Sequence, residues 1–391
     1  MKKILIIIVF CFFSTFSFAN DWEFWAEGEH IVPLRGSNVA IEKEKLTFKL
    51  VKEGLLVNVK FIFNSPVDEK KLIGFITPGA EKENYPLGIK DFKTIVNGKE
   101  VKSNVKKFSE VTSKKIIDKK VIKEYEMKKA KYDEYYYDKD YVYYFEADFK
   151  KGINIVEHSY LFSPNNLISN YKREFTYILT TISKWKNKKI KDFEIEVYPG
   201  TAFVRLPYTF WENKKKIDWK IIGSGKIASI EPMTKAIGDY FDSSATKLGG
   251  TFVKLDSGYL SYKAKDFCPD DNYEFFLNSV DEVAAFPQLF ENVNLGKYII
   301  LEDKYMYPLY LASIGKINED FEFSDDFTKN DFDILYNFPY ALAGYDFDRK
   351  DLKDYFSKFF WYSPVSKNVK INPHYTKLLK IIDKERAKRK I

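Results

Sequence analysis

Apolar and polar residues alternate along much of the first two thirds of the chain. In EKLTFKLVKEGLLVNVKFIFNSP, residues 44–66, apolar side chains recur at every second position on each side of Glu53-Gly54. Side chains of a strand point alternately to its two faces, so this pattern predicts two half-buried strands joined by a turn. Their inner faces would carry Leu46, Phe48 and Leu50 in the first strand and Val57, Val59, Phe61 and Phe63 in the second.

The alternation continues in later segments that are separated by glycine-containing turns. Asn97-Gly98 lies between short apolar runs in KTIVNGKEVK, and this dipeptide favours the tight turn of a β-hairpin. We expect two further turns, in GSGK at 223–226 and in Asp256-Ser257-Gly258. The other strand candidates are INIVEHSYLF, EFTYILTT, DFEIEVYPG and TFVKLDSGYLSYKAK. Many short strands with few helical runs predict an antiparallel β-sandwich-like domain.

A charged stretch from Ser103 to Asp140 interrupts this pattern and contains neither glycine nor proline. We expect an inserted arm that is helical in part and returns to a strand at Tyr141. Its tyrosines could stack on a sugar, but we favour packing against their own domain, because aromatic surface is usually consumed in packing. These tyrosines are Tyr132, Tyr135, Tyr136 and Tyr137.

Beyond residue 270 the apolar spacing changes to three and four residues, which is typical of helices. We expect helices within 270–293 and 305–315, followed by a small helical module. In YALAGYDFDRKDLKDYFSKFFWYSP, residues 340–364, Gly344 is suited to end one helix and Asp348 to cap the next, with Asp351 nearly completing a capping box. The apolar stripe of that second helix would be Leu352, Tyr355, Phe356, Phe359 and Phe360, with Lys353, Asp354, Ser357 and Lys358 facing away.

A third helix of the module is predicted near the C-terminus. Asn372-Pro373 is typical of a helix start, because proline fits the first turn, where its missing N–H is not needed. The inner face of this helix would carry Tyr375, Leu378, Leu379 and Ile382. The apolar stripes of the module would therefore form its core.

Charge is divided unevenly along the chain. The formal charge is +7, yet residues 266–333 carry 16 acidic residues against 4 lysines, and residues 334–391 carry 13 basic residues against 6 acidic ones. Such switches in sign indicate boundaries near 265 and 333. Together with the strand and helix patterns they predict an α+β multidomain chain. Its parts would be a signal peptide at 1–19, a β-rich domain at 20–277 with an insertion at about 103–140, an acidic helical connector at 278–326 and a helical domain at 327–391.

The N-terminus has the pattern of a secretory signal peptide. Lys2 and Lys3 precede the apolar run ILIIIVFCFF, and small residues at 17 and 19 favour cleavage between Ala19 and Asn20. The apolar run has ten residues, too few to cross a bilayer as a helix. The mature chain would then lie outside the cytoplasm, in the periplasm or secreted. It would keep one cysteine, Cys268, which we expect to be a half-buried residue beside Pro269.

The first part of the mature chain resembles a family of uncharacterised secreted bacterial proteins, a domain of unknown function. The matching pieces are VAIEKEKLTFKLVKEGLLVNVKFIFNSP, REFTYILTTISKWKNKKIKDFEIEV and YKAKDFCPDDN. The resemblance implies an extracytoplasmic β domain and no established activity.

The last part, from about Phe327 to the C-terminus, resembles the YARHG domain, an extracellular bacterial module. The matching residues are Asn337, Tyr340, Ala341, Gly344, Tyr345, Phe347, Leu352, Tyr355, Phe356, Trp361, Tyr362 and Pro364. The chain departs from the signature at Leu342 and Ala343, where the domain's name has arginine and histidine, and Pro339 should bend or shorten the first helix. We interpret the segment as scaffold, with Trp361 and Tyr362 its only candidate surface contacts.

No motif predicts a reaction, a cofactor or a metal. We find no zinc-protease helix, phosphate-binding loop or nucleophile elbow, and histidine, the usual proton shuttle, occurs only at His30, His158 and His374. SDDFTKNDFD, residues 324–333, lacks the glycine and closing glutamate of a calcium loop, and Thr328 with Asp331 is as typical of a helix start.

Three hypotheses of function follow from these observations. The first is a non-catalytic exported protein of the cell envelope that binds wall polymer, an anionic surface or another envelope protein. The basic tail KERAKRKI would contact the anionic component, and nucleic acid is not expected as a partner outside the cytoplasm. The second is a hydrolase that uses carboxylates on an envelope substrate. The third is a purely structural surface protein, which the sequence does not separate from the first.

Overall fold

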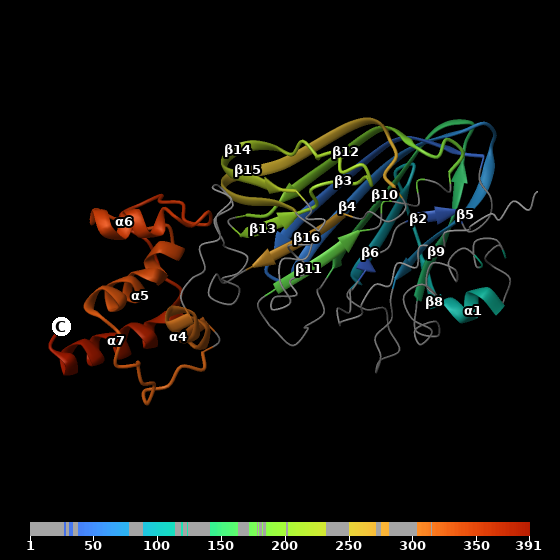
Figure 1. The fold of residues 1–391 in the computed structure, drawn as a ribbon. Coiled ribbons are helices and arrows are strands. Elements are labelled where there is room, and N and C mark those ends of the chain that lie inside the picture. Colours follow the sequence, from blue (N-terminus) through green and yellow to red (C-terminus); the bar gives the residue numbers. More distant parts are fainter. Residues whose placement is uncertain are drawn as a thin grey trace, which may run out of the picture.

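The computed structural model combines a large β region with a small helical module (Figure 1). It describes residues 27–28, 31–33, 38–77, 89–113, 119, 123, 141–162, 172–177, 179, 182, 185–200, 202–231, 250–270, 275–280, 303–313 and 315–391. The predicted cleavage site at Ala19 and Asn20 and the tyrosines at 132 and 135–137 lie outside these residues.

The larger sheet has 12 strands, in the order β1-β11-β16-β13-β15-β12-β3-β4-β10-β6-β7, with β14 paired to β15. Its strands are β1 (Glu27–Gly28), β3 (Ala40–Val51), β4 (Gly54–Ser65), β6 (Ile89–Val96), β7 (Lys99–Val101), β10 (Gly152–Phe162), β11 (Lys172–Tyr177), β12 (Ile190–Tyr198), β13 (Phe203–Leu206), β14 (Lys220–Ile230), β15 (Gly250–Phe267) and β16 (Phe275–Val280). Most pairs are antiparallel, as predicted, but β12 runs parallel to β3 and β1 runs parallel to β11.

Aromatic contacts between non-neighbouring strands show that this sheet folds over onto itself. Phe48 of β3 stacks on Phe275 of β16 with ring centroids 4.3 Å apart. Phe162 of β10 meets Phe175 of β11 edge-on at 5.5 Å. The alternating apolar residues of β3 and β4 therefore face β11 and β16 across a shared core, which gives the predicted sandwich-like packing.

A smaller sheet covers one end of this core. Its order is β2-β5-β9-β8, with β2 (Ile31–Pro33), β5 (Glu69–Thr77), β9 (Tyr141–Phe149) and β8 (Asn104–Lys107). Helix α1 (Phe108–Ser113) follows β8, and β9 begins at Tyr141, where the alternation returns after the predicted arm. Phe75 of β5 contacts Tyr160 of β10 at 5.4 Å, which joins the two sheets.

The two serine–glycine segments that we predicted to be turns lie inside paired strands. Gly223, Ser224 and Gly225 belong to β14, and Ser257 and Gly258 belong to β15, with Ser224 opposite Ser257. A side chain at Gly258 would place its Cβ 1.9 Å from the carbonyl oxygen of Ile222. These glycines allow two strands to approach closely beside a bulge, and the prediction of turns was wrong.

Residues 275–280 form strand β16, although we predicted a helix within 270–293. FFLNSV is a short apolar run, and such a run is compatible with a helix or a buried strand when its periodicity alone is considered. This segment pairs with β11 on one side and with β13 on the other, and these pairings make it a strand. The helix expected at 305–315 is confirmed as α4 (Asp303–Ser313).

The helical module consists of α4 and the elements that follow it. These are α5 (Lys329–Leu342), α6 (Lys350–Phe356), η4 (Pro373–Tyr375) and α7 (Thr376–Arg389). Helix α5 continues through Pro339 to Leu342, and Gly344 then adopts a φ of +80, as expected for a residue that follows a helix end. Asn372 caps the next element, as predicted, by accepting a hydrogen bond from the His374 N–H at 3.1 Å.

The start of α6 differs from the prediction. Its N-cap is Arg349, which makes no capping hydrogen bond, and Asp348 instead pairs with Lys367. Asp351 binds the Arg349 guanidinium at 2.6 Å rather than completing a capping box. Ion pairs of Asp348 with Lys367 and of Asp351 with Arg349 therefore replace the local cap that the spacing suggested.

A small contact joins the helical module to the β region. Phe360 meets Phe203 of β13 edge-on at 5.9 Å, and Phe252 of β15 belongs to the same apolar cluster. The Ser363 hydroxyl donates to the Asp256 carboxylate at 2.7 Å, and the Lys226 ammonium donates to the carbonyl oxygen of Tyr362. The segment after α6 therefore attaches the module to β13, β14 and β15.

Candidate functional site

The YARHG-like residues are mainly interior residues of the helical module. Leu352 is 3% exposed and Phe356 is 0% exposed, as the predicted stripe requires. The residues predicted to face away are all exposed: Lys353, Asp354, Ser357 and Lys358. Trp361 and Tyr362 are 3% and 1% exposed, so the prediction that they are surface contacts was wrong. The Tyr362 hydroxyl donates to the carbonyl oxygen of Tyr345 at 2.8 Å, which holds the chain after α6 against the turn that follows α5.

Asp331 caps α5 and is not arranged to hold calcium. Its backbone N–H donates to the Thr328 hydroxyl at 3.2 Å, and its carboxylate accepts from the Thr328 N–H at 2.8 Å, which completes a capping box. Lys304 lies 2.9 Å from the same carboxylate, and the Tyr305 hydroxyl donates to it. Burial alone would raise the pKa of Asp331, but the bonds from Lys304, Tyr305 and Thr328 hold it well below its usual value.

The two arginines of the C-terminal tail face inward. Arg386 pairs with Asp333 of α5, and Arg349 reaches the other oxygen of that carboxylate at 2.9 Å. Arg389 binds Glu385 at 2.8 Å and donates to the carbonyl oxygen of Phe323 at 3.1 Å. Arginine suits such sites because its planar group supplies several donors in fixed directions. These two charges therefore hold the module together.

The lysines of α7 face outward and form one stripe. Lys377, Lys380, Lys384 and Lys388 follow one another at spacings of three and four residues and are all exposed. Lys388 lies 3.6 Å from Glu385, whereas the other three form no ion pair with any residue that the structure describes. The buried residues Leu378, Leu379 and Ile382 lie on the opposite side of the helix, and Ile381, four residues after Lys377, is buried beside the stripe. We refer to these four lysines as the α7 lysine stripe.

Carboxylates on the outer face of the large sheet are neutralised by lysines of adjacent strands. Glu194 of β12 lies 3.0 Å from Lys263 of β15 and 3.7 Å from Lys45 of β3. Glu196 lies 2.7 Å from Lys45. Burial alone would raise the pKa of Glu194, but the surrounding lysines hold it below its usual value. Glu194 therefore remains ionised as part of a cross-strand ladder and is not poised as a general acid.

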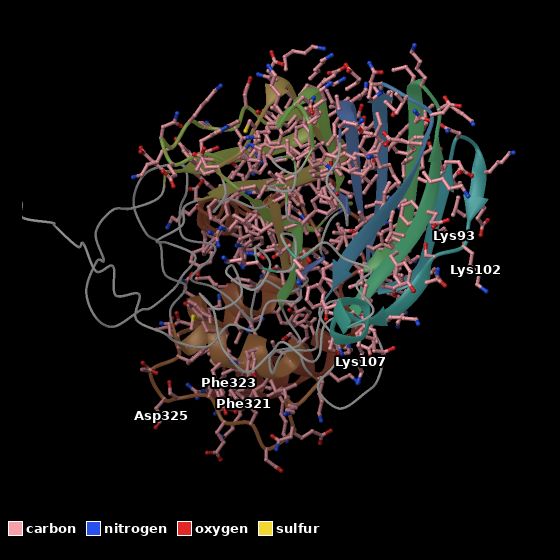
Figure 2. All side chains as sticks on the ribbon, turned by 90° about the vertical axis from the view of Figure 1, so that its right-hand side faces the viewer. Lys93, Lys102, Lys107, Phe321, Phe323 and Asp325 are labelled. Atoms are coloured by element: carbon pink, nitrogen blue, oxygen red, sulfur yellow. The ribbon has the colours of Figure 1, made fainter. Side chains whose placement is uncertain are left out.

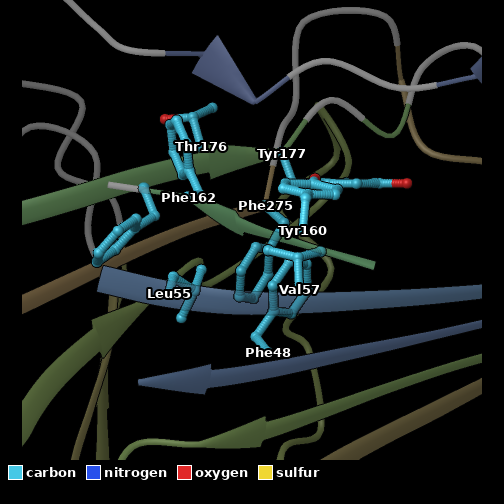
Figure 3. A pocket seen from close by; sticks show the side chains of 9 residues that line it. Phe48, Leu55, Val57, Tyr160, Phe162, Thr176, Tyr177 and Phe275 are labelled. Atoms are coloured by element: carbon cyan, nitrogen blue, oxygen red, sulfur yellow. The ribbon is translucent and has the colours of Figure 1, made fainter. Parts of the chain in front are cut away.

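A narrow aromatic pocket lies between the two halves of the folded sheet (Figure 3). Its volume is about 190 Å³, and Phe48, Tyr160, Tyr177 and Phe275 are among the residues that line it. Ligand pockets are usually larger, roughly 300–1,000 Å³. The Tyr177 hydroxyl donates to the carboxyl group of Glu44 at 3.5 Å, and burial raises the pKa of Glu44 to about 8. The pocket is a packing gap beside a buried neutral carboxyl group.

His158 is also buried, and its ring is a poor base. Its Nδ1 lies 3.0 Å from the Thr94 hydroxyl, and its ring stacks on Phe92 with centroids 5.4 Å apart. Burial lowers the pKa of His158 to about 3, so the ring is neutral near neutral pH and a poor base. Cys268 is exposed, not half-buried as predicted, and its carbonyl oxygen accepts a hydrogen bond from the Trp211 indole N–H at 2.9 Å.

Among the residues that the structure describes, no three His, Cys, Asp or Glu side chains are grouped in a way that could hold a metal ion. In the same part of the chain, no helix has both the length and the apolar composition needed to cross a bilayer.

Comparison with known proteins identifies the helical module. Residues 307–386 match the YARHG domain. This match begins inside α4, so the domain includes a helix that we had expected in the connector. The division of the chain at 277 and 327 stays a prediction. No curated protein matches the chain.

Two solved structures from Legionella pneumophila are similar to the chain. A candidate nutrient-binding protein is 17% identical, with a TM-score of 0.47, over 92% of this chain and 98% of that one. An aminopeptidase A in complex with aspartic acid is 8% identical, with a TM-score of 0.27, over 64% of this chain and 23% of that one. Both TM-scores are below 0.5, and neither likeness assigns a function to this chain.

The sequence did not reveal that the arginines and the lysines of α7 have different roles. We interpreted KERAKRKI as one basic tail, whereas Arg386 and Arg389 bind inside the module and the lysines remain outside. The spacing of Lys377, Lys380, Lys384 and Lys388 is visible in the sequence and could have revealed the stripe.

Proposed function

We propose that the chain is a non-catalytic exported protein of the cell envelope that binds an anionic component through the α7 lysine stripe. Lys377, Lys380 and Lys384 carry the proposal, because they are exposed, share one helix face and have no carboxylate partner among the described residues. Positive charge that a fold leaves unneutralised attracts anionic groups. The match to the YARHG domain and the predicted signal peptide agree with a site of action outside the cytoplasm.

The alternative of a carboxylate hydrolase has no specific support in the described residues. Glu44 and Asp331 are the described carboxyl groups whose pKa departs furthest from the usual value. Both already bind other groups of the fold. Glu44 is buried against Tyr177 in the core, and Asp331 caps α5 while it binds Lys304. A glycoside hydrolase that works through carboxylates needs two carboxyl groups that flank one bond of the substrate. Their hydrogen-bond partners Tyr177 and Tyr305 belong to different apolar clusters.

Binding of mature protein to isolated cell envelopes at increasing salt tests the proposal. The informative variant replaces Lys377, Lys380 and Lys384 by glutamine. The matched control replaces Lys316, Lys350 and Lys370, which are exposed lysines scattered over the same module. Each lysine near an anionic surface contributes about 1 kcal/mol, so three losses should weaken binding by roughly a hundredfold.

The result expected for the control is binding within a few fold of the wild type. Salt should weaken the wild-type interaction, because exposed charges are screened over about 8 Å at physiological ionic strength. Binding that is equally insensitive to salt and to the stripe variant would contradict the proposal. Export is tested separately by sequencing the N-terminus of protein from the native cell, where Asn20 is expected as the first residue.

A further inference from the structure

The outward-facing residues of the large sheet stand in rows that cross its strands. One row runs over β10, β4, β3, β12, β15 and β14, and it is apolar or aromatic except for one lysine. In the order of these strands it consists of Leu161, Leu56, Lys49, Tyr198, Tyr259 and Ile222. Their neighbours along the strands, such as Val57 and Phe48, are 1% exposed and face the core. The row therefore lies on the outer surface of the sheet.

A second row, two residues further along these strands, carries uncharged polar groups. Ser159, Asn58 and Thr47 lie opposite one another on β10, β4 and β3, and their side chains form no hydrogen bond with any residue that the structure describes. The next row belongs to the cross-strand ladder, where Lys60 lies 2.9 Å from Glu157. We call the first row, together with Ser159, Asn58 and Thr47, the outer strip. It differs from the ladder because its side chains form no ion pairs with described residues.

Tyr198 and Tyr259 form an aromatic platform within the outer strip. Their rings stack with centroids 4.7 Å apart and 20° between the ring planes. The Tyr198 hydroxyl donates to the Glu196 carboxylate at 3.1 Å, and Lys45 binds the other oxygen of that carboxylate at 2.7 Å. Both rings are partly exposed, and Ile222, at 47% exposure, extends the apolar surface onto β14. Side chains that are held in place in this way lose little conformational freedom when a ligand binds.

The outer strip also carries positive charge. Lys49 belongs to its first row, and Lys93 of β6 continues its second row beyond β10, at the border of the sheet that Figure 2 shows. Both lysines are exposed and form no ion pair with a described residue. Glu196, which faces the strip from β12, is already bound by Lys45, and Glu100 of β7 stands at the level of the ladder. A ligand of the strip should therefore carry negative charge.

A chain of sugars that carry carboxylate groups matches these three features. One face of a pyranose ring presents C–H groups, which suit an aromatic ring, and its rim presents hydroxyls that can bond with Ser159, Asn58 and Thr47. The strands lie about 4.8 Å apart, close to the length of one sugar in an extended glycan, so successive strands can contact successive sugars. A lone phosphate or a lipid head group would use the lysines and leave the rest of the strip without a partner.

We infer that the outer strip binds an acidic polysaccharide. The chain of sugars would cross the strands, with sugar rings over Tyr198 and Tyr259 and with carboxylates near Lys49 and Lys93. The inference goes beyond the proposed function, because it assigns a second binding surface, on the β region, and names the class of its ligand. This surface and the α7 lysine stripe do not depend on each other.

Binding of the full mature protein to immobilised hyaluronan tests the inference. Hyaluronan is an extended polysaccharide with a carboxylate on every second sugar. Polyglutamate offers the charge without sugars, and hydroxyethylcellulose offers sugars without the charge. The first variant is Tyr259→Thr, and its control is Tyr144→Thr, at a half-buried tyrosine in β9 of the smaller sheet.

The second variant replaces Lys49 and Lys93 by glutamine. Its control replaces Lys186 and Lys316, which are exposed lysines far apart in the sequence. The α7 stripe variant is measured beside both. Thermal unfolding of each variant shows whether the fold is kept, and Ile222→Thr, at an exposed position of the same row, takes the place of Tyr259→Thr if that variant unfolds early.

We expect Tyr259→Thr to weaken binding to hyaluronan roughly tenfold and to leave binding to polyglutamate unchanged. The variant at Lys49 and Lys93 should bind hyaluronan roughly thirtyfold more weakly, because two charges near the anionic chain are lost. Both controls should stay within a few fold of the wild type.

Hyaluronan binding that is unchanged in both variants, or reduced equally in their controls, overturns the inference. If such binding is lost only in the α7 stripe variant, the α7 proposal stands and the outer strip has no part in it. Hydroxyethylcellulose bound as tightly as hyaluronan overturns the acidic ligand. Polyglutamate bound as tightly as hyaluronan, with no effect of Tyr259→Thr on either, shows a surface that recognises charge alone and overturns the polysaccharide.

Discussion

Gly223 of β14 and Gly258 of β15 lie directly opposite each other, with φ angles of +134 and +91. A Cβ at Gly223 would lie 2.9 Å from the Cα of Gly258, and a Cβ at Gly258 would lie 1.9 Å from the carbonyl oxygen of Ile222. Both contacts are with backbone atoms, which do not move aside without disturbing the pairing of the two strands. The pair therefore fixes the course of β14, which borders the contact with the helical module.

Gly258→Ala is expected to destabilise the protein strongly. The substitution would add a strained positive φ, which costs about 1–2 kcal/mol for an L-residue, to a backbone clash. Gly98→Ala is the matched control, because Gly98 also has a positive φ of +80 but has nothing within 4 Å of its Cβ position. Urea unfolding should show a loss of about 1–2 kcal/mol for the control and clearly more for Gly258→Ala. Equal losses would mean that the close approach is not a constraint.

Phe356→Ala and Lys353→Ala test the interior of the YARHG module. Phe356 is fully buried against Phe338 and Phe347, with ring centroids 5.5 and 5.2 Å away, and its truncation should cost about 3–5 kcal/mol. Lys353 is exposed and lies 3.4 Å from Asp346, so its loss should stay within about half a kcal/mol. Similar melting temperatures for the two variants would show that the apolar stripe is assigned to the wrong face.

Much of the fold follows from local pattern. Where one strand face is buried, as with Leu46 and Phe48, alternation shows directly in the sequence and the strands were predicted correctly. The same holds for Phe356, since spacings of three and four residues place it with Leu352 on one helix face. These elements are predictable because each one's own residues specify which face is buried.

The features that were missed depend on partners far away in the sequence. Ser224 and Ser257 are 33 residues apart but lie opposite each other, and only this pairing explains why glycines flank them inside strands. Trp361 and Tyr362 could have been surface aromatics by composition, and their burial depends on Phe338 and Tyr345. The inward role of Arg386 depends on Asp333, which lies 53 residues before it.

Stability should fall as pH rises through the range in which Glu44 titrates. Burial raises the pKa of Glu44 from 4.5 to about 8, so between these values the folded chain holds a proton that the unfolded chain has released. The stabilisation is then complete below pH 4.5 and declines with rising pH, by up to about 1.4 kcal/mol per pH unit. Glu44→Gln should remove this decline, which urea unfolding at a series of pH values would show.

His158 produces the opposite slope, and the two slopes offset each other between pH 4.5 and 6.5, so the decline caused by Glu44 should be visible above pH 6.5. Burial lowers its pKa from 6.5 to about 3, so the unfolded chain binds the extra proton and stability falls as pH drops below 6.5. Glu100→Gln, at an exposed position of β7, is a suitable control for the Glu44 substitution. A decline in stability above pH 6.5 that persists unchanged in Glu44→Gln would assign that decline to another group.

Truncation after Asp383 should damage the fold and not simply lower the charge. It removes Arg386, which pairs with Asp333 and lies over the Tyr336 ring at 5.1 Å, and Arg389, which binds the carbonyl oxygen of Phe323. Hydrogen bonds to charged groups contribute about 1.5–3 kcal/mol each, so the loss of both arginines should destabilise the module by at least about 2 kcal/mol.

Replacement of Lys384, Lys388 and Lys390 by glutamine removes three of the tail's positive charges and keeps both arginines. We expect this triple variant to unfold at the same urea concentration as the wild type and to bind anionic envelope material more weakly, whereas the truncated chain should unfold earlier. If the truncated chain is as stable as the wild type, the arginine contacts do not hold α7 in place, and the whole tail would then be available to an anionic partner.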